Sequence, residues 1–361
     1  MPTISKTKYH LLPAHRYSWR RLAWQAKIAS LKANDWPILV GPWRGEIGFE
    51  CLYWIPFLDH LKDLGIAKER MVPITRGGAG VWYDTPTALE IYAMRTPQQV
   101  RIENRVHITQ TGLHKQETVT PFDRSLIRDA ADTLNLTRYH VLHPAWMYHI
   151  LAPFWTGDCG TEWLAPRVAF RTLMPPPLPE GVVLPDQFLA VRFYARETFQ
   201  NHPKLMRPFL QSITEQMVGS LPIVILDSPF HLDDHIDLTL GCEGDRVTHL
   251  SQLVPNLTPE NNLAVMSAIL GRAQGFVGTY GGFAQLALRH ARPSVTFYTK
   301  WGGTSLAHKS LSDTLALRLG VSTYVINVGD IPILSSLLPI AEPIPPRGGK
   351  LDTREAQHVV A

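Results

Sequence analysis

A glycine-rich turn near residue 280 is the part of the sequence best suited to bind a ligand. The short apolar run Gly275–Val277 leads into Thr279, Gly281 and Gly282, and apolar residues then recur at helical spacing. A strand that passes through such a turn into a helix points backbone N–H groups, a threonine hydroxyl and the positive end of the helix dipole at one place. Glycine lets an anion approach closely. The pattern predicts a phosphate-binding turn, although it is neither GxGxxG nor a P-loop, and an ordinary structural turn is the alternative.

A second segment, His231–His235 (HLDDH), offers two histidines four residues apart with carboxylates between them. Histidines at this spacing bind zinc when a helix places them on one face. Here the segment follows a predicted strand and Pro229, so we expect a loop. The sequence therefore predicts no metal site.

Composition limits the class of protein and its compartment. With 45% apolar and 18% charged residues, the chain can bury full cores and is not disordered as a whole. It shows neither an apolar run near the ~20 residues of a membrane span nor the apolar core of a signal peptide. Cys51, Cys159 and Cys242 are far apart and lack CxxC spacing, which favours a reducing, cytoplasmic location over a disulfide framework.

Positive charge is concentrated in residues 1–36, where seven lysines and arginines face a single acid, Asp35. Apolar residues interleave with these charges at three- to four-residue spacing: Trp19, Leu22, Trp24, Ile28 and Leu31. We favour a helix that packs on the body of the protein and exposes a basic face. Peripheral contact with an anionic membrane, at the inner membrane face, is the alternative. No nucleic-acid-binding motif accompanies the charge, so we expect no nucleic-acid partner.

The remaining chain alternates strand-like and helix-like segments in two halves of about 150–180 residues each. After the basic segment 1–36, we expect an N-terminal α/β domain at 37–174, a proline-rich linker at 175–186, a C-terminal α/β domain at 187–338 and a tail at 339–361. Proline cannot continue a helix or a central strand, so the linker is expected to be irregular. The fold class is thus α/β, with two doubly wound, Rossmann-like domains that face a cleft.

The predicted elements place the candidate residues. Strands are expected at 37–41, 71–75, 188–194, 222–226, 247–250, 275–277, 294–298 and 323–328, and residues 98–109 also look strand-like. Helices are expected at 49–64, 88–94, 122–136, 206–219, 259–273, 313–319 and 331–338, and short helices within 140–155. Ligands of doubly wound sheets bind outside the carboxyl ends of the strands. The loops after these strands are therefore the candidate site.

Two stretches resemble a known family. Residues 40–58 (VGPWRGEIGFECLYWIPFL) and residues 258–299 (TPENNLAVMSAILGRAQGFVGTYGGFAQLALRHARPSVTFYT) resemble bacterial two-domain glycosyltransferases of the GT-B fold. The resemblance covers both domains, and the second stretch is the more specific. It implies that the C-terminal half holds a nucleotide-sugar donor, that the N-terminal half holds a glycan or glycoconjugate acceptor, and that neither a metal nor another cofactor is needed.

The resemblance also implies roles for donor-side residues. The turn residues Thr279, Gly281 and Gly282 would hold the donor diphosphate. Glu260, on the helix before that strand, would contact the ribose hydroxyls, unless it is only an acid at a helix N-terminus. Arg192 and Arg196 would neutralise the departing diphosphate. An ion pair with Glu197 is the alternative for these arginines.

For the catalytic base, the resemblance points to Glu46 in the loop after the first strand. Transfer to a hydroxyl needs a group that takes its proton. A carboxylate that caps the next helix is the structural alternative. Arg44 would bind an anionic acceptor or pair with Glu46. Less specific candidates at strand ends are Asp227, Ser228 and Lys300. His143, with the aromatic residues near it, would stack on a sugar ring or belong to a cluster on the face of the domain.

These residues together predict a glycosyltransferase that moves a sugar from a nucleotide-sugar donor to a hydroxyl acceptor in surface polysaccharide or glycoconjugate synthesis. A sugar-nucleotide epimerase has a similar fold and would need no acceptor. A non-catalytic, membrane-associated binding module is the other alternative.

Overall fold

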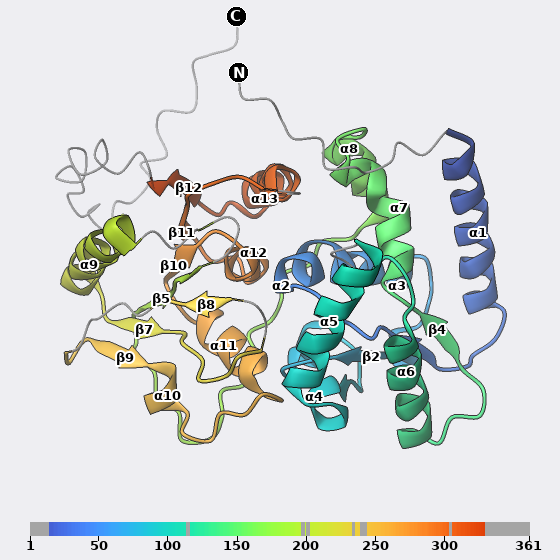
Figure 1. Cartoon of the computed structure of the whole chain (residues 1–361), viewed down its shortest axis with the longest axis horizontal. Coiled ribbons are helices and arrows are strands. Elements are labelled where there is room, and N and C mark those ends of the chain that lie inside the picture. The colour runs from blue at the N-terminus through green and yellow to red at the C-terminus, as the bar shows by residue number, and fades with distance from the viewer. Residues whose placement is uncertain are drawn as a thin grey trace, which may run out of the picture.

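The computed structural model describes residues 14–112, 116–195, 199, 203–232, 235–238, 244–302 and 305–328. The chain forms two α/β halves that lie side by side, each built on its own parallel sheet (Figure 1). The predicted helix at 331–338 and the tail at 339–361 lie outside the described residues. Within the described part, no helix combines the length and the apolar character of a membrane span.

The N-terminal sheet has four parallel strands in the order β3 (Leu89–Glu90), β2 (Met71–Thr75), β1 (Ile38–Val40) and β4 (His140–Leu142). Alternate residues of β1 enter different cores. Leu39 packs in the cluster that contains residues of α4 (Ile91–Met94), α5 (Pro97–Thr111) and α6 (Pro121–Thr133). Ile38 and Val40 pack with α3 (Ile55–Asp63) and α7 (Ala145–Trp155). Both faces of the sheet are covered, which explains the continuous apolar runs of its strands.

The remaining N-terminal elements connect these strands. The helix predicted at 49–64 is present as one continuous helical path: α2 (Ile47–Phe49), the π-helical turn η1 (Glu50–Trp54) and α3. The other elements are α1 (Ala14–Lys32), η2 (Lys68–Arg70), η3 (Ala79–Trp82), α8 (Thr161–Leu164) and η4 (Ala165–Arg167).

Three local predictions in this half are wrong. Residues 98–109 form a helix, α5, because Thr96 and Gln99 make a reciprocal capping box and Pro97 starts the helix. Its β-branched residues suggested a strand, but the capping signal decided the outcome. The segment 88–94 begins with the two-residue strand β3 before α4, and the region 140–155 begins with the short strand β4.

The C-terminal sheet has six parallel strands in the order β12 (Thr323–Asn327), β11 (Ser294–Tyr298), β10 (Gly275–Thr279), β5 (Leu189–Arg192), β7 (Ile223–Ile225) and β9 (Val247–His249). Its helices are α9 (Pro203–Ser220), α10 (Leu250–Leu253), α11 (Asn262–Leu270), α12 (Gly282–Arg289) and α13 (Ser305–Leu319). A small antiparallel pair, β6 (Tyr194–Ala195) and β8 (Ile236–Asp237), lies beyond the end of β5. Two doubly wound parallel sheets are thus confirmed.

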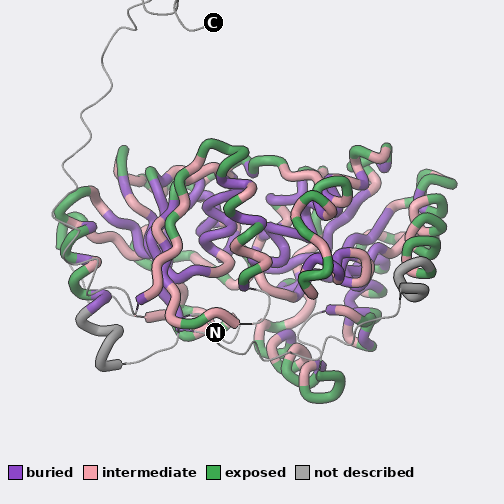
Figure 2. Tube along the Cα trace, turned by 90° about the horizontal axis from the view of Figure 1, so that it is seen from above, coloured by how far each residue is buried: buried purple, intermediate pink, exposed green. Residues whose placement is uncertain are grey.

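The two halves share one hydrophobic core. A single buried cluster contains Ile38 and Leu58 of the N-terminal half together with Val224, Phe276 and Leu311 of the C-terminal half. Figure 2 shows buried segments throughout the middle of the molecule. The helices α2 and α12 meet where the halves join (Figure 1). The junction is therefore closely packed along this core.

Polar contacts also cross the junction. Trp82 donates from Nε1 to Ser267 Oγ at 2.9 Å, and Ser267 Oγ is 2.8 Å from His290 Nε2. His290 Nδ1 is 2.9 Å from the carbonyl oxygen of Leu173, just before the proline-rich segment. Since that carbonyl only accepts, Nδ1 carries the proton, and Ser267 donates to Nε2. No helix or strand forms between η4 and β5, where the chain crosses between the halves.

Candidate functional site

The predicted phosphate-binding turn lies where β10 passes into α12. Thr279 is fully buried, and its hydroxyl accepts a hydrogen bond from the Tyr194 N–H and donates one to the Tyr194 carbonyl, both at 3.0 Å. The single hydroxyl proton is thus used within the protein. This differs from the predicted role, in which the Thr279 side chain holds a phosphate, since the hydroxyl instead ties β6 to the end of β10.

Gly281 and Gly282 are half-buried at the start of α12. A methyl group added to Gly281 would collide with the Tyr194 hydroxyl. One added to Gly282 would lie 2.9 Å from Ile47 Cβ and 3.2 Å from the Gly48 nitrogen, in the other half. A side chain at position 282 would clash with α2, one at position 281 would have to displace the Tyr194 hydroxyl, and the N-cap residue Gly281 has no side chain with which to cap α12. An anion that binds these amides has to share this space with Tyr194 and α2.

Arg192 lies beside this turn, as predicted. It ends β5, directly opposite Gly278 in β10. Its guanidinium carbon is 4.4 Å from the centroid of the Phe283 ring, in the first turn of α12. The guanidinium also forms an ion pair with Asp237, with Nη2 to Oδ1 at 3.1 Å and Nε to Oδ1 at 3.3 Å. Arg196 and its predicted alternative partner Glu197 lie outside the described residues.

Glu46 reaches the same region from the N-terminal half. It occupies the N-cap position of α2 with an extended backbone, but within the described part of the chain its side chain makes no capping hydrogen bond. The side chain is half-buried. The next two residues, Ile47 and Gly48, contact Gly282. The structure thus brings the loop of Glu46 to the N-terminus of α12, although more than 230 residues separate them in the sequence.

Glu260 occupies a different part of the junction. It precedes α11 in a turn and is exposed, whereas the sequence placed it on the helix. The first amides of α11, those of Leu263 and Ala264, donate to the carbonyl of Gly77 at 2.8 and 3.0 Å. The N-terminus of α11 is therefore capped by backbone from the other half. Glu260 lies at the rim of this contact, because its carbonyl oxygen is close to Gly78.

The loop that carries Glu46 is held by two buried ion networks. In the first, Arg44 Nε donates to Asp123 Oδ1 at 2.7 Å, and His143 Nε2 lies 3.3 Å from Asp123 Oδ2. Burial acts to raise the pKa of Asp123, but the neighbouring His143 ring and the Arg44 guanidinium hold it well below its usual range. Arg44 thus pairs with Asp123, and His143 is buried beside it and has no open face for a sugar ring.

In the second network, Glu50 accepts hydrogen bonds from Thr75 Oγ1 at 2.8 Å, from Arg76 Nη1 at 2.9 Å and from the Tyr83 hydroxyl. Burial raises the pKa of Glu50, and the three donors oppose part of this effect. Arg76 also donates to the carbonyl of Gly45, the residue before Glu46. This network fixes the backbone of the Glu46 loop to β2.

Glu90 is a titratable group that the sequence did not single out. It ends β3 and accepts hydrogen bonds from the amides of Gly77, Gly78 and Tyr92, at 2.8 to 2.9 Å. Burial raises the pKa of Glu90 to about 7, although these amides favour its ionised form. Its carboxylate holds the loop that caps α11. No signal in the sequence pointed to it, because 88–94 was predicted as a helix and the two-residue strand β3 was missed.

His249 is the second group that was missed. It is the last residue of β9, and its Nδ1 lies 2.8 Å from Asp227 Oδ2, just beyond β7. Asp227 also accepts a hydrogen bond from the Leu250 amide, and Ser228 Oγ is 3.1 Å from Asn262 Oδ1 in α11. Both side chains of the pair remain about one-third exposed. Asp227 and Ser228 were predicted at this edge; the histidine could have been, since parallel strands end there.

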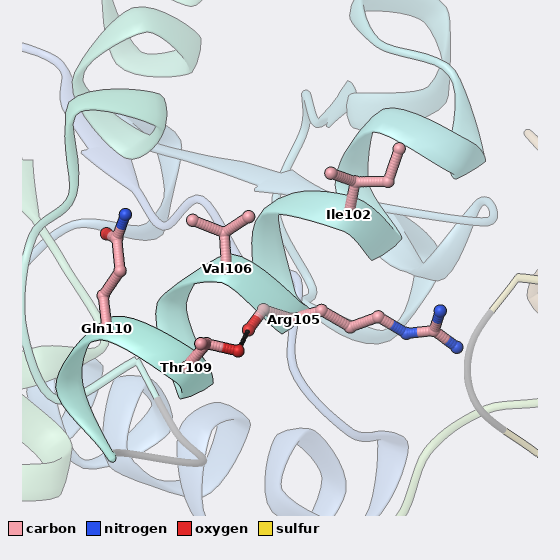
Figure 3. A pocket seen from close by; sticks show the side chains of 5 residues that line it. All are labelled: Ile102, Arg105, Val106, Thr109 and Gln110. Atoms are coloured by element: carbon pink, nitrogen blue, oxygen red, sulfur yellow. Dashed lines mark hydrogen bonds between the residues drawn. The ribbon is translucent and has the colours of Figure 1, made fainter.

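The remaining candidates are Lys300 and the HLDDH segment. Lys300 is exposed after β11. In the HLDDH segment, Asp233 and Asp234 lie outside the described residues, while the His235 ring centroid is 4.5 Å from that of Tyr194. A shallow cavity of about 310 Å³ is lined by Ile102, Arg105, Val106, Thr109 and Gln110 of α5 (Figure 3). None of the predicted site residues lines it.

Comparisons with known proteins complete this description. No family model and no curated protein matches the chain. Among solved structures, the E. coli heptosyltransferase WaaC with ADP has a TM-score of 0.40 at 11% identity, covering 83% of this chain and 99% of that chain. A family 9 glycosyl transferase from Veillonella parvula has 0.41 at 11% identity, covering 85% and 90%. The UDP-GlcNAc 2-epimerase from Methanocaldococcus jannaschii has 0.37 at 10% identity, covering 84% and 91%.

Proposed function

We propose that this chain is a glycosyltransferase that moves a sugar from a nucleotide-sugar donor to a hydroxyl of a glycan or glycoconjugate acceptor. One observation carries the proposal: Arg192, the amides at the start of α12 and the Glu46 loop meet where the carboxyl ends of two doubly wound sheets face each other. A cation and helix amides suit a diphosphate, and a carboxylate from the opposite half suits the acceptor.

In the proposed reaction, Glu46 takes the proton of the acceptor hydroxyl. The acceptor oxygen then bonds to the anomeric carbon of the sugar, while the bond from that carbon to the diphosphate oxygen breaks. The bonding electrons leave with the nucleoside diphosphate. Arg192, with Arg196 as a second predicted cation, and the amides of Gly281 and Gly282 would stabilise its growing charge. This role for Glu46 belongs to transfer with inversion at the anomeric carbon.

Four residues bear on how the donor would bind. Tyr194 covers Gly281, and a bound diphosphate would displace its hydroxyl. Arg192 would exchange Asp237 for a phosphate, a stronger partner for a guanidinium fork. Thr279 would act by holding the Tyr194 backbone, and exposed Glu260 would receive the ribose.

We further propose that the reaction takes place in the cytoplasm, in polysaccharide or glycoconjugate synthesis, and needs no bound metal or other cofactor.

The test is a thermal-shift screen of the full chain against UDP, GDP, ADP, CMP and TDP. A ligand at about 100 times its Kd stabilises the native state by about 2.7 kcal/mol, so a matching nucleotide should raise the Tm measurably. The sugar-nucleotide of that base is then incubated with the protein, with and without a hydroxyl acceptor. A transferred product supports the proposal. An isomerised sugar without acceptor identifies an epimerase, and no shift with any nucleotide contradicts both enzyme assignments.

A further inference from the structure

The N-terminal helix α1 has two apolar faces, and only one of them packs on the protein. Trp24 lies against Phe57 and Trp146, with ring centroids 4.9 and 5.5 Å apart, and Leu31 is fully buried. This confirms the prediction that the helix packs on the body of the protein. The sequence grouped all its large apolar residues into one set, but the structure divides them between two sides.

The second face points to solvent. Trp19 is 72% exposed and Leu22 is 56% exposed. Together with the exposed Ala23 and Ala26 they follow the spacing i, i+3, i+4, i+7, which makes one continuous stripe along a helix. The helix lies at the outer side of the N-terminal half, away from the junction (Figure 1), and its outward side is exposed (Figure 2). Nothing in the fold requires a tryptophan and a leucine there.

The charge around this stripe indicates what would cover it. The helix contains five lysines and arginines and no acid, whereas the formal net charge of the whole chain is only +4. Arg20 and Arg21 sit between Trp19 and Leu22. Arg167 lies nearby: burial lowers the pKa of its guanidinium, and Arg21 lowers it further. An exposed apolar stripe among uncompensated cations matches an anionic lipid surface, where tryptophan enters the headgroup region and arginines pair with the lipid charges.

We infer that the outward stripe of α1 docks on an anionic membrane surface, with Trp19 and Leu22 inserted and Arg20 and Arg21 among the headgroups. The contact lies parallel to the surface and does not span the bilayer. It keeps the junction between the two halves away from the membrane, because α1 lies on the far side of the N-terminal half (Figure 1). The inference does not depend on the proposed sugar transfer.

The test is cosedimentation of the full chain with vesicles, in the absence of donor and acceptor. Vesicles of equal parts phosphatidylglycerol and phosphatidylcholine should bind the protein, and vesicles of phosphatidylcholine alone should not. The double variant W19S/L22S should lower the partition coefficient at least about tenfold, from the lost burial of two large apolar side chains. In R20Q/R21Q, the loss of each arginine should lower the partition coefficient about fivefold, and added salt should weaken the binding of the parent chain.

Matched controls separate this contact from other causes. Q25S changes an exposed residue of the same helix outside the stripe and should bind lipid like the parent chain. W19S/L22S should keep the Tm of the parent, since neither side chain packs on the fold. The inference is overturned if the parent does not bind anionic vesicles or if W19S/L22S binds them equally well. A dimer in light scattering that W19S/L22S converts to monomer would assign the stripe to a second copy of the chain instead.

Discussion

The carboxyl edges of the two sheets carry similar charged residues in opposite environments. On the N-terminal edge, Arg44 and Asp123 pair with side chains that are 1% and 0% exposed. On the C-terminal edge, the Asp227–His249 pair is about one-third exposed and Arg192 meets a partly exposed Asp237. Buried networks lock a loop in place, whereas exposed pairs can exchange partners at little cost. We propose that the first edge positions Glu46 and that the second receives a ligand.

The largest expected effect is on stability, and it should differ between Asp123 on the N-terminal edge and Asp227 on the C-terminal edge. D123N should lower the free energy of unfolding by about 3–5 kcal/mol, because Arg44 would remain buried without its counter-charge. D227N should cost less than about 1 kcal/mol, since water replaces its partner. Urea denaturation of both variants measures the difference. Equal losses would remove the distinction between a locked and an adjustable edge.

The next effect concerns turnover. E46Q keeps the size of the side chain but removes its basicity, so we expect kcat to fall by at least about a hundredfold with little change in nucleotide affinity. E69Q, an exposed acid in η2, is the control and should be fully active. A fully active E46Q would leave the locked edge without a catalytic group.

The pH dependence of stability tests the role of Glu90, whose carboxylate holds the loop of Gly77 and Gly78 on the N-terminal edge. Its folded pKa of about 7 lies above the unfolded value, so the native state binds more protons between about pH 4.5 and 7. Stability from this group should therefore fall as pH rises through that window, by about 3 kcal/mol in total, and change no further above it. E90Q should lack this slope. Denaturation at several pH values measures the free energy of unfolding of both proteins. The same pH dependence in the parent and in E90Q would contradict this role of Glu90.

The smallest effect probes the adjustable edge. R192Q should weaken binding of the nucleoside diphosphate about tenfold, through loss of a charge-assisted contact. D237N should strengthen it, because the diphosphate no longer competes with a carboxylate for Arg192. Calorimetry with the nucleotide identified by thermal shift measures both. If D237N weakens binding, or R192Q leaves it unchanged, the diphosphate does not use this arginine.

The features that depend on neighbouring residues could be predicted from the sequence. Apolar runs and helix signals such as Thr120 and Asp123 predicted both sheets and most helices, because strand burial and capping are properties of neighbouring residues. The meeting of Arg192 with the turn at Gly281 was predictable as well, since parallel strands end at one edge. Residues 98–109 were misassigned because β-branched residues outweighed the capping box at Thr96.

Side-chain contacts between residues far apart in the sequence could not be predicted. Arg44 pairs with Asp123, 79 residues away, and not with its neighbour Glu46. Tyr194 covers Gly281 because the chain turns into β6 directly after β5. The three-residue strand β4 has no local signature either. Such contacts depend on how distant elements pack against each other. A short segment of sequence does not show that packing.

The hydrophobic cluster that runs through both halves has a consequence for how the chain assembles. If the gene were divided within residues 175–186, each fragment would present to water the apolar surface that now faces its counterpart. Each fragment would keep only its own smaller cluster and would lose the burial that the shared core provides. The proline-rich segment thus joins two parts of a single cooperative unit, and heat or urea should melt both together.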